Sequence, residues 1–383
     1  MTSRSPHVLP QPPCIVFVAN RGYALTSSRI YLIRRFLAQG WRVVVATSRD
    51  HHAQQLELEG ATLETAIFQR GGLFIYSDLQ ALQSLVRIYR KYRPRLIHHF
   101  HAKPIILGTL AARWINGAKV VNTITGLGHA FISGGLSQWL AEMGYRQMLS
   151  RSTMTIFQNS DDLQLFMQKG WVTSRNSGLI ISSGVDTERF RPLGAGRHEL
   201  PRVLMATRLL WEKGIREFVE AAQIIKRENP SVRFQLAGEW DLEHPNSVDP
   251  KWVESVAHTG TIEFLGYLTN LEEELPWIDI FVLPSYYREG MPRVLLEAAA
   301  CGIPVVTTDA PGCREAVVDG ETGFLVPPRD GIALARSIST LLCNPPLCQR
   351  MGIAGRQRVL EKFDIRRITE QYLNTYHSIG IKI

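Results

Sequence analysis

The chain has 383 residues, 45% of them hydrophobic and 20% charged, which is enough to bury two cores of ordinary domain size. Its five cysteines are odd in number and form no CxxC units, which argues against a disulfide framework or a zinc site and favours a reducing compartment. No run reaches the roughly 20 apolar residues of a transmembrane helix, and residues 1–13 lack a signal-peptide core, so we expect a cytoplasmic protein that does not span a membrane.

The net charge of +8 is concentrated in the first half of the chain. Residues 1–195 contain 22 Lys and Arg against 10 Asp and Glu, whereas the remainder contains 21 against 25. Such a positive field attracts nucleic acid, an anionic membrane leaflet or a diphosphate-bearing lipid. Residues 79–95 place apolar side chains at helical spacing and carry a cluster of cations toward their end, namely Arg87, Arg90, Lys91, Arg93 and Arg95. This pattern predicts an amphipathic helix whose cationic end either is simply solvated or faces a membrane.

Strand and helix patterns alternate through the first half, and this alternation predicts a parallel sheet. The expected strands cover residues 14–19, 43–47, 96–99, 119–123, 154–157 and 178–181. The expected helices include residues 28–39, 108–115 and 161–169. Residues 186–201 are rich in proline and glycine, which is typical of a linker.

A second alternating unit follows this linker. Its expected strands cover residues 203–206, 234–238, 262–265, 280–283 and 305–307, and its expected helices cover residues 215–227, 294–301 and 331–342. The predicted fold class is therefore α/β, with two doubly wound, Rossmann-like domains that face a cleft. We place the first domain at residues 1–190 and the second at residues 191–362.

Two glutamates stand eight positions apart in the stretch Tyr-Tyr-Arg-Glu-Gly-Met-Pro-Arg-Val-Leu-Leu-Glu-Ala at residues 286–298. Glu289 lies in a loop just after the strand at 280–283, and Glu297 lies about two turns into a helix that Pro292 opens at its first position. Both carboxylates can therefore face one cleft. The alternative is a solvated helix with two unrelated surface glutamates, but the surrounding helix is almost wholly apolar or small, so a charge at Glu297 needs a partner.

The bend between these glutamates consists of Gly290, Met291 and Pro292. A bend at the start of a helix leaves backbone N–H groups without partners, and such groups suit an oxygen-rich, anionic ligand.

Two cations, Arg208 and Lys213, follow the expected strand at 203–206. In an open α/β sheet ligands bind at the carboxyl ends of strands, and two cations there can hold a diphosphate and stabilise it as it departs. Cations are common in loops, so this pair indicates a ligand site only when it is taken together with the two glutamates.

Together these motifs resemble the donor-binding half of the retaining GT-B glycosyltransferases of family four. The wording Ser-Tyr-Tyr-Arg-Glu-Gly-Met-Pro-Arg-Val-Leu-Leu-Glu at 285–297, with Pro-Gly-Cys-Arg-Glu at 311–315, is similar to bacterial enzymes that extend an undecaprenyl-diphosphate-linked saccharide. The resemblance is strong over residues 200–342 and weaker before them. It also implies that a final helix within residues 363–383 returns to the first domain.

The resemblance implies roles for the motif residues. Arg208 and Lys213 would neutralise the departing diphosphate of a UDP-sugar donor, and Glu297 would hold the ribose hydroxyls. Glu289, with the backbone of the bend, would orient the donor sugar, for which N-acetylgalactosamine or another N-acetylhexosamine is the expectation. A phosphate oxygen of the leaving group can deprotonate the acceptor hydroxyl, so no separate protein base is required. No DxD element is present, which fits a metal-independent reaction without a cofactor.

The first domain departs from the broader family in two loops. The loop that begins at Asn20 carries one glycine where many members are glycine-rich, and Asn20 is our candidate for a substrate contact there. Thr125 and Gly126 stand where many members have His-Gly, so these two residues are candidate substrate contacts as well. Either His129 or His101 replaces the usual histidine, unless both are ordinary loop residues.

The acceptor implied by the resemblance is a polyprenyl-diphosphate saccharide, in the assembly of a bacterial surface glycan or glycoprotein glycan. We accordingly expect a peripheral protein on the inner, cytoplasmic face of the cell membrane. An apolar stripe over residues 131–148 is either core or in part an element that dips into the bilayer interface, with Trp139 as the first candidate.

Two other functions compete with this interpretation. A sugar-nucleotide epimerase has the same scaffold but needs acid and base groups that no local motif supplies. A nucleic-acid partner would explain the basic first half, but the sequence has neither an aromatic-interleaved basic motif nor a helix-turn-helix pattern, so we expect none.

Overall fold

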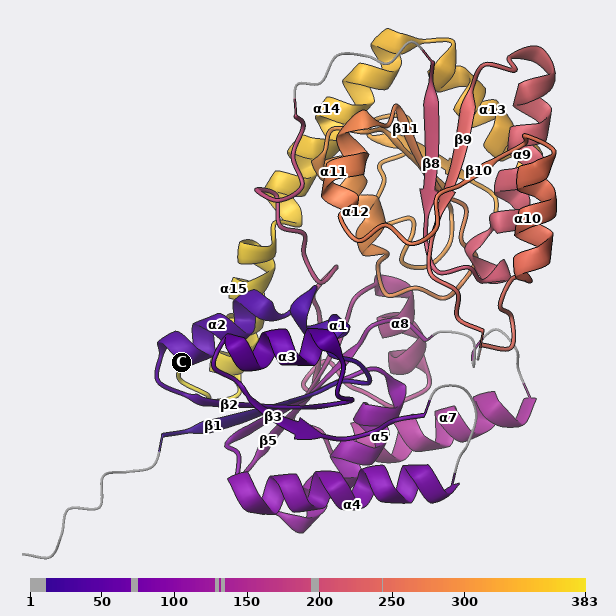
Figure 1. Cartoon of the computed structure of the whole chain (residues 1–383). Helices are drawn as coiled ribbons and strands as arrows, with labels where there is room; N and C mark the ends of the chain where they lie inside the picture. The colour runs from indigo at the N-terminus through magenta and orange to yellow at the C-terminus, as the bar shows by residue number, and fades with distance from the viewer. Residues whose placement is uncertain (1–11, 70–74, 128–130, 132–134, 194–199, 243) are drawn as a thin grey trace, which may run out of the picture.

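The computed structural model describes residues 12–69, 75–127, 131, 135–193, 200–242 and 244–383. Two parallel sheets divide the chain into a first half and a second half, which lie one above the other in Figure 1 with helices on both faces of each sheet. The predicted α/β class with two doubly wound sheets is confirmed.

The first sheet has seven strands in the order β3-β2-β1-β4-β5-β6-β7. They are β1 (Cys14–Val18), β2 (Arg42–Thr47), β3 (Thr62–Thr65), β4 (Leu96–Phe100), β5 (Lys119–Ile124), β6 (Met154–Phe157) and β7 (Ser177–Leu179). The helices that the structure describes in this half are α1 (Tyr23–Thr26), α2 (Ile30–Ala38), α3 (His51–Leu58), α4 (Ile75–Tyr92), α5 (Ala102–Ala111), the 3₁₀ turn η1 (Ala112–Trp114), α7 (Gly135–Leu149) and α8 (Ser160–Gln168). Strands β1 and β4 are buried along their whole length, as expected for central parallel strands covered on both faces.

The second sheet has six strands in the order β10-β9-β8-β11-β12-β13. They are β8 (Arg202–Ala206), β9 (Arg233–Ala237), β10 (Glu263–Phe264), β11 (Ile280–Leu283), β12 (Val305–Thr308) and β13 (Gly323–Val326). The helical elements are η2 (Trp211–Lys213), α9 (Ile215–Glu228), α10 (Pro250–His258), α11 (Leu271–Glu274), η3 (Leu275–Trp277), α12 (Arg293–Ala300), α13 (Gly331–Leu342), α14 (Pro345–Lys362) and α15 (Ile365–Ser378).

The strand order reverses at one point in each sheet, between β1 and β4 in the first and between β8 and β11 in the second. Ligands of open α/β sheets bind beyond the carboxyl ends of the strands at such a switch point. Asn20 and His101 follow β1 and β4, whereas Arg208 and Glu289 follow β8 and β11. These four candidate residues therefore lie at the switch points.

Helix α15 packs against the first half (Figure 1). Its residues Tyr372 and Tyr376 are buried in the core of the first sheet. The hydroxyl of Tyr376 lies 2.6 Å from Nδ1 of His98, and the buried guanidinium of Arg29 lies 4.8 Å from the ring centres of both Phe100 and Tyr372. These contacts make α15 an integral part of the first half.

The two segments that join the halves lie side by side. The N–H of Val185 donates to the carbonyl of Phe363, and the N–H of Ile365 donates to the carbonyl of Val185, both at 2.9 Å. The two connecting segments therefore pair through a parallel β-bridge between Val185 and Asp364.

Some elements differ from the sequence-based expectation. The helix expected at 108–115 begins six residues earlier, because Pro104 lies in the first turn, where its missing N–H is tolerated. Helix α12 begins at Arg293, and Pro292 is its extended N-cap residue and not its first helical residue. Short or partly exposed elements such as β3 and α3 escaped prediction because their apolar periodicity is weak.

Among the helices that the structure describes, none has both the length and the apolar character that crossing a bilayer requires.

Candidate active site

The loop after β8 brings two cations to the switch point of the second sheet. Arg208 follows β8, and Lys213 ends the turn η2. Gly214 comes next with a φ of +82°, and a Cβ atom there would lie 2.2 Å from the carbonyl oxygen of Pro284. Only glycine permits so close an approach, which holds η2 against the end of β11. Lys213 therefore lies beside the loop that follows β11.

Lys213 forms an ion pair with Glu289, the first of the two predicted carboxylates. Only 8% of the Lys213 side chain and 14% of the Glu289 side chain are exposed, so solvent screens their attraction weakly. Ser285 Oγ donates to Glu289 Oε1 at 3.3 Å, and Lys213 Nζ lies 4.7 Å from the centre of the Tyr287 ring. An anionic ligand that reaches Lys213 must compete with the Glu289 carboxylate.

Arg208 also has an acidic partner, Asp241, whose Oδ2 accepts from Nη1 at 2.9 Å. Burial alone would lower the pKa of Arg208, but the neighbouring Tyr287, Glu289 and Asp241 outweigh it and raise the pKa above its ordinary value. The charge of Arg208 therefore interacts with Glu289 as well. The structure brings Arg208, Lys213 and Glu289 together, and it adds Asp241, which the sequence did not single out.

Glu297 lies apart from this group, on α12. It is 8% exposed, and Oε1 accepts from Nη2 of Arg293 at 2.9 Å, one helical turn away. The Nε and Nη1 atoms of Arg293 are buried and have no hydrogen-bond partner among the described residues. This guanidinium was not predicted from the sequence, and it leaves two donors for a ligand next to Glu297.

Tyr23 of α1 approaches Glu297 from the first half. Burial raises the pKa of Tyr23, and Arg293, Glu297 and Tyr267 of the second half lie close enough to influence it electrostatically. Yet Tyr23 is 52% exposed and Tyr267 is 57% exposed. The exposed Tyr23 of the first half therefore lies within electrostatic range of Arg293 and Glu297 of the second half.

The loops of the two halves meet at Gly126 and Gly290. A Cβ atom on Gly126, whose φ is +103°, would lie 2.4 Å from the nitrogen of Gly290, and one on Gly290 would lie 2.6 Å from the carbonyl carbon of Thr125. Larger residues would separate the loops. The backbone of Thr125 and Gly126 therefore lies against that of Gly290, the first residue of the Gly-Met-Pro bend.

Two further candidates of the first half, Asn20 and His101, lie at its switch point. Asn20 is partly buried, and its Oδ1 has no hydrogen-bond partner among the residues described. His101 has φ 71° and ψ 159°, a region almost confined to glycine that costs about 1–3 kcal/mol and recurs at functional sites. His129 lies outside the described residues. Of the two histidines left open by the sequence, His101 therefore has a structural feature in its favour.

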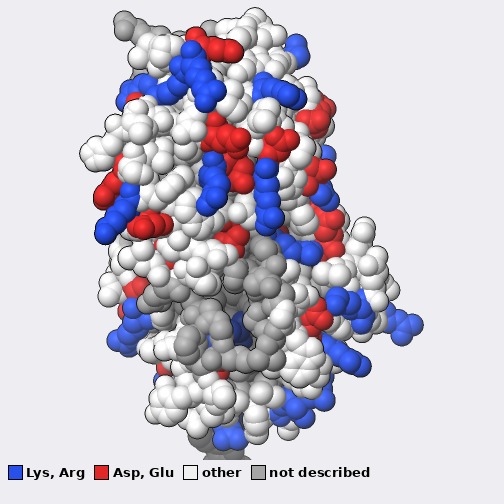
Figure 2. Space-filling model, turned by 90° about the vertical axis from the view of Figure 1, so that its right-hand side faces the viewer, with Lys and Arg blue, Asp and Glu red and all other residues white. Residues whose placement is uncertain are grey.

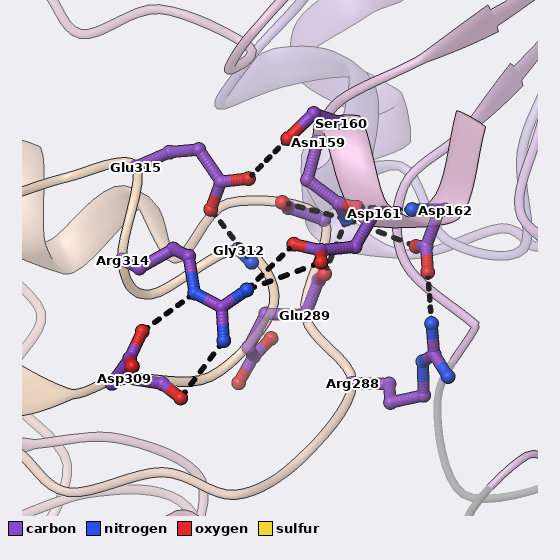
Figure 3. A network of polar contacts seen from close by, with 11 residues as sticks. Asn159, Ser160, Asp161, Asp162, Arg288, Glu289, Asp309, Gly312, Arg314 and Glu315 are labelled. Carbon is purple, nitrogen blue, oxygen red and sulfur yellow. Dashed lines mark hydrogen bonds and ion pairs between the residues drawn. The ribbon is translucent and has the colours of Figure 1, made fainter. Parts of the chain in front are cut away.

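The N-terminus of α8 contributes a set of contacts that no motif announced (Figure 3). Asn159 Nδ2 donates to the carbonyl oxygens of Glu289 and Gly290, at 2.9 Å and 3.3 Å. Asp162 accepts from Arg288 at 2.7 Å, and Asp161 accepts from Arg314 at 3.1 Å. The only available signal was the pattern Asn-Ser-Asp-Asp at the start of a helix, which is typical of an N-cap and of nothing more.

Within the described part of the chain, no three His, Cys, Asp or Glu side chains gather into a group that could hold a metal ion.

Comparisons with known proteins agree with this geometry. The sequence profile of the family described as glycosyl transferases group 1 matches residues 186–358, and that described as glycosyl transferase 4-like matches residues 14–159. The chain is 28% identical over 381 residues to the N,N'-diacetylbacillosaminyl-diphospho-undecaprenol α-1,3-N-acetylgalactosaminyltransferase of Campylobacter jejuni. This match covers 95% of this chain and 98% of the relative. It is 26% identical over 319 residues to the UDP-Gal:α-D-GlcNAc-diphosphoundecaprenol α-1,3-galactosyltransferase of Escherichia coli, covering 79% of this chain and 80% of that enzyme.

Among solved structures, HepE of Anabaena in complex with UDP-glucose superimposes with a TM-score of 0.80 at 19% identity, over 95% of this chain and 99% of that one. This likeness confirms the predicted fold. The chain belongs to the group 1 glycosyltransferases of family four, and its two facing sheets form the GT-B fold.

Proposed function

We propose that this protein is a retaining, metal-independent glycosyltransferase that transfers a sugar from a UDP-sugar to an undecaprenyl-diphosphate-linked saccharide. N-acetylgalactosamine is the first donor sugar to test, followed by other N-acetylhexosamines. The observation that carries the proposal is the group of Arg208, Lys213 and Glu289 at the switch point of the second sheet. The domain limits 1–190, 191–362 and 363–383 belong to the same proposal.

The two cations suit a departing diphosphate. Their charges are balanced by Glu289 and Asp241. A diphosphate that took the place of these two carboxylates would release Glu289, which could then accept hydrogen bonds from the hydroxyls of the donor sugar. Because charge develops on the diphosphate as the sugar departs, contacts from Arg208 and Lys213 strengthen in the transition state and accelerate the reaction.

Glu297 and the backbone complete the donor site. Glu297 accepts from the ribose hydroxyls, and the N–H groups of Gly290 and Met291 have no acceptor among the described residues and lie at the N-terminal end of α12. The acceptor hydroxyl approaches from the first half, past Thr125, Gly126, Asn20 and His101. A phosphate oxygen of the leaving group takes its proton, and the configuration at the anomeric carbon is retained.

The acceptor assignment rests on the two relatives, both of which are named for a diphospho-undecaprenol saccharide. Exposed side chains of the first half agree with a lipid-linked acceptor, since Ile75 and Tyr76 at the start of α4 are each 76% exposed and Trp139 of α7 is 57% exposed. Large apolar and aromatic side chains of this kind insert into a bilayer interface. In Figure 2, Lys and Arg predominate on the lower part of the face shown, where the first half lies. We propose that this half docks on the inner leaflet.

A donor panel tests the function. UDP-N-acetylgalactosamine, UDP-N-acetylglucosamine, UDP-galactose and UDP-glucose are each mixed with a short-chain polyprenyl-diphosphate saccharide, and UDP release and product mass are followed. We expect UDP release that depends on the acceptor, and a product with an α linkage by NMR. Salt-sensitive binding to DNA, without turnover of any donor, would contradict the proposal.

A further inference from the structure

Four consecutive residues at the start of α8 each contact the second half (Figure 3). They are Asn159, Ser160, Asp161 and Asp162, and their partners are the carbonyls of Glu289 and Gly290, the carboxylate of Glu315, and the guanidinium groups of Arg314 and Arg288. The contacts converge on the loops 288–290 and 312–315. One end of one helix therefore holds both loops from the opposite half of the molecule.

Asn159 is the most constrained member of this set. It is fully buried, and its Oδ1 accepts from the N–H of Asp162 at 2.7 Å. Because a backbone N–H can only donate, this contact fixes the orientation of the amide and leaves Nδ2 to face the second half. The Nδ2 group also donates to Asp162 Oδ2 at 2.9 Å, so its two hydrogens are shared among three acceptors.

The two carbonyls that Asn159 binds determine where the following N–H groups point. In a planar trans peptide the C=O and the next N–H point in opposite directions. Holding the carbonyls of Glu289 and Gly290 toward α8 thus turns the N–H groups of Gly290 and Met291 away from it. Gly126 lies directly against the Gly290 nitrogen, which leaves the N–H of Met291 as the better placed donor for a ligand.

The same loop carries the Glu289 carboxylate to Lys213. A loop of this length without a side-chain anchor has several backbone conformations, and each would place that carboxylate differently. Asp162, itself almost fully buried and paired with Arg288, holds the residue before Glu289.

We propose that Asn159 is a positioning residue of the first half, which acts across the interface to fix the Glu289 carboxylate and the Met291 N–H in the geometry that the donor sugar requires. This inference rests on the proposed function of Glu289 and of the backbone that follows it.

Asn159 also caps α8, and the test must separate the two roles. The variant Asn159→Ser retains an N-cap acceptor but is too short to reach the second half. Asn344→Ser is the matched control, since Asn344 caps α14 in the same way, accepting from the N–H of Leu347 at 3.1 Å, and contacts neither loop.

Steady-state UDP release from UDP-N-acetylgalactosamine with a short-chain acceptor is measured together with UDP affinity by calorimetry and with thermal stability. For Asn159→Ser we expect kcat to fall about ten- to a hundred-fold, with UDP affinity and donor KM changed less than about two-fold. Asn344→Ser should match the wild type in all three. Wild-type kcat in Asn159→Ser would overturn the inference, as would a loss of activity that is matched by an equal loss of UDP affinity.

A second readout keeps the inference separate from the proposed function. If the wild type releases UDP from none of the four UDP-sugars, the proposed function fails. Amide hydrogen exchange over residues 286–293 then decides the inference, since it should be faster in Asn159→Ser than in the wild type and unchanged in Asn344→Ser. Equal protection in all three proteins would refute it.

Discussion

The two halves of the molecule contribute different kinds of groups where their loops meet. The second half supplies charged side chains that are already paired within it, Lys213 with Glu289 and Arg208 with Asp241. The first half supplies close backbone contact at Gly126 and a buried amide at Asn159. We propose from this difference that the donor chemistry belongs to the second half, whereas the first half fixes the loop geometry in which that chemistry operates. Substitutions in the two halves should therefore affect different kinetic constants.

The largest expected effect comes from the two cations. Loss of a charge-assisted contact to the departing diphosphate costs about 2–4 kcal/mol in the transition state, so Lys213→Ala and Arg208→Ala should each lower kcat/KM at least ten-fold and up to about a thousand-fold. Lys226→Ala, at a partly exposed lysine of α9 whose Nζ donates to the carbonyl of Gly260, is the control and should behave as the wild type. Activity within two-fold of wild type in Lys213→Ala, with its fold intact by circular dichroism, would remove this residue from the site.

The two glutamates should differ from each other. Glu289→Gln should mainly lower kcat, because Glu289 acts on the sugar as it is transferred. Glu297→Gln should mainly raise the donor KM, because ribose contacts exist before and during the reaction. We expect about ten-fold changes in each case. Kinetic profiles that are the same for both variants would contradict the division of roles.

Acid should act on the first half before the second. Burial lowers the pKa of His99 to about 4 and that of His98 well below its ordinary value. Both side chains are neutral in the folded protein, so between pH 6.5 and about 4 the unfolded chain binds more protons, and stability falls as pH falls through this window. The expected loss is a few kcal/mol.

Hydrogen exchange at pH 7 and at pH 5 measures this difference. Peptides from β1, β4 and β5 should lose protection on acidification more than peptides from β8 and β11. His99→Asn, which removes the titrating group, should weaken the pH dependence. Equal losses in both halves would show that these histidines do not control acid stability.

The smallest effect on catalysis is expected at the membrane face. Replacing Arg90, Lys91, Arg93 and Arg95 by Gln should reduce flotation with anionic vesicles, in a salt-dependent way, while leaving turnover of a short water-soluble acceptor unchanged. Lys91 already pairs with Glu64 at 2.7 Å, so it should contribute least of the four. Trp139→Ala should weaken binding to neutral vesicles as well. Equal recovery of the wild type and of the variant with all four substitutions on anionic vesicles would show that this end of α4 is not the docking face.

How far the sequence could predict the site depends on the separation of its parts along the chain. Arg208, Lys213 and Glu289 follow strands that local patterns reveal, and the reversal of strand order then brings them together. Asp241 contacts Arg208, 33 residues away in the sequence, and Asn159 contacts Glu289, 130 residues away. The sequence around each residue gives no sign of these contacts. The start of α5 was misjudged because a proline in a first turn looks like a break.

The central claim is that the two cations exchange partners when the donor binds. A structure with UDP bound should show Lys213 Nζ within hydrogen-bond distance of a phosphate oxygen, the Glu289 carboxylate released from it, and Glu297 at the ribose hydroxyls. UDP bound away from the switch point of the second sheet, or bound there with the Lys213–Glu289 pair intact, would contradict it.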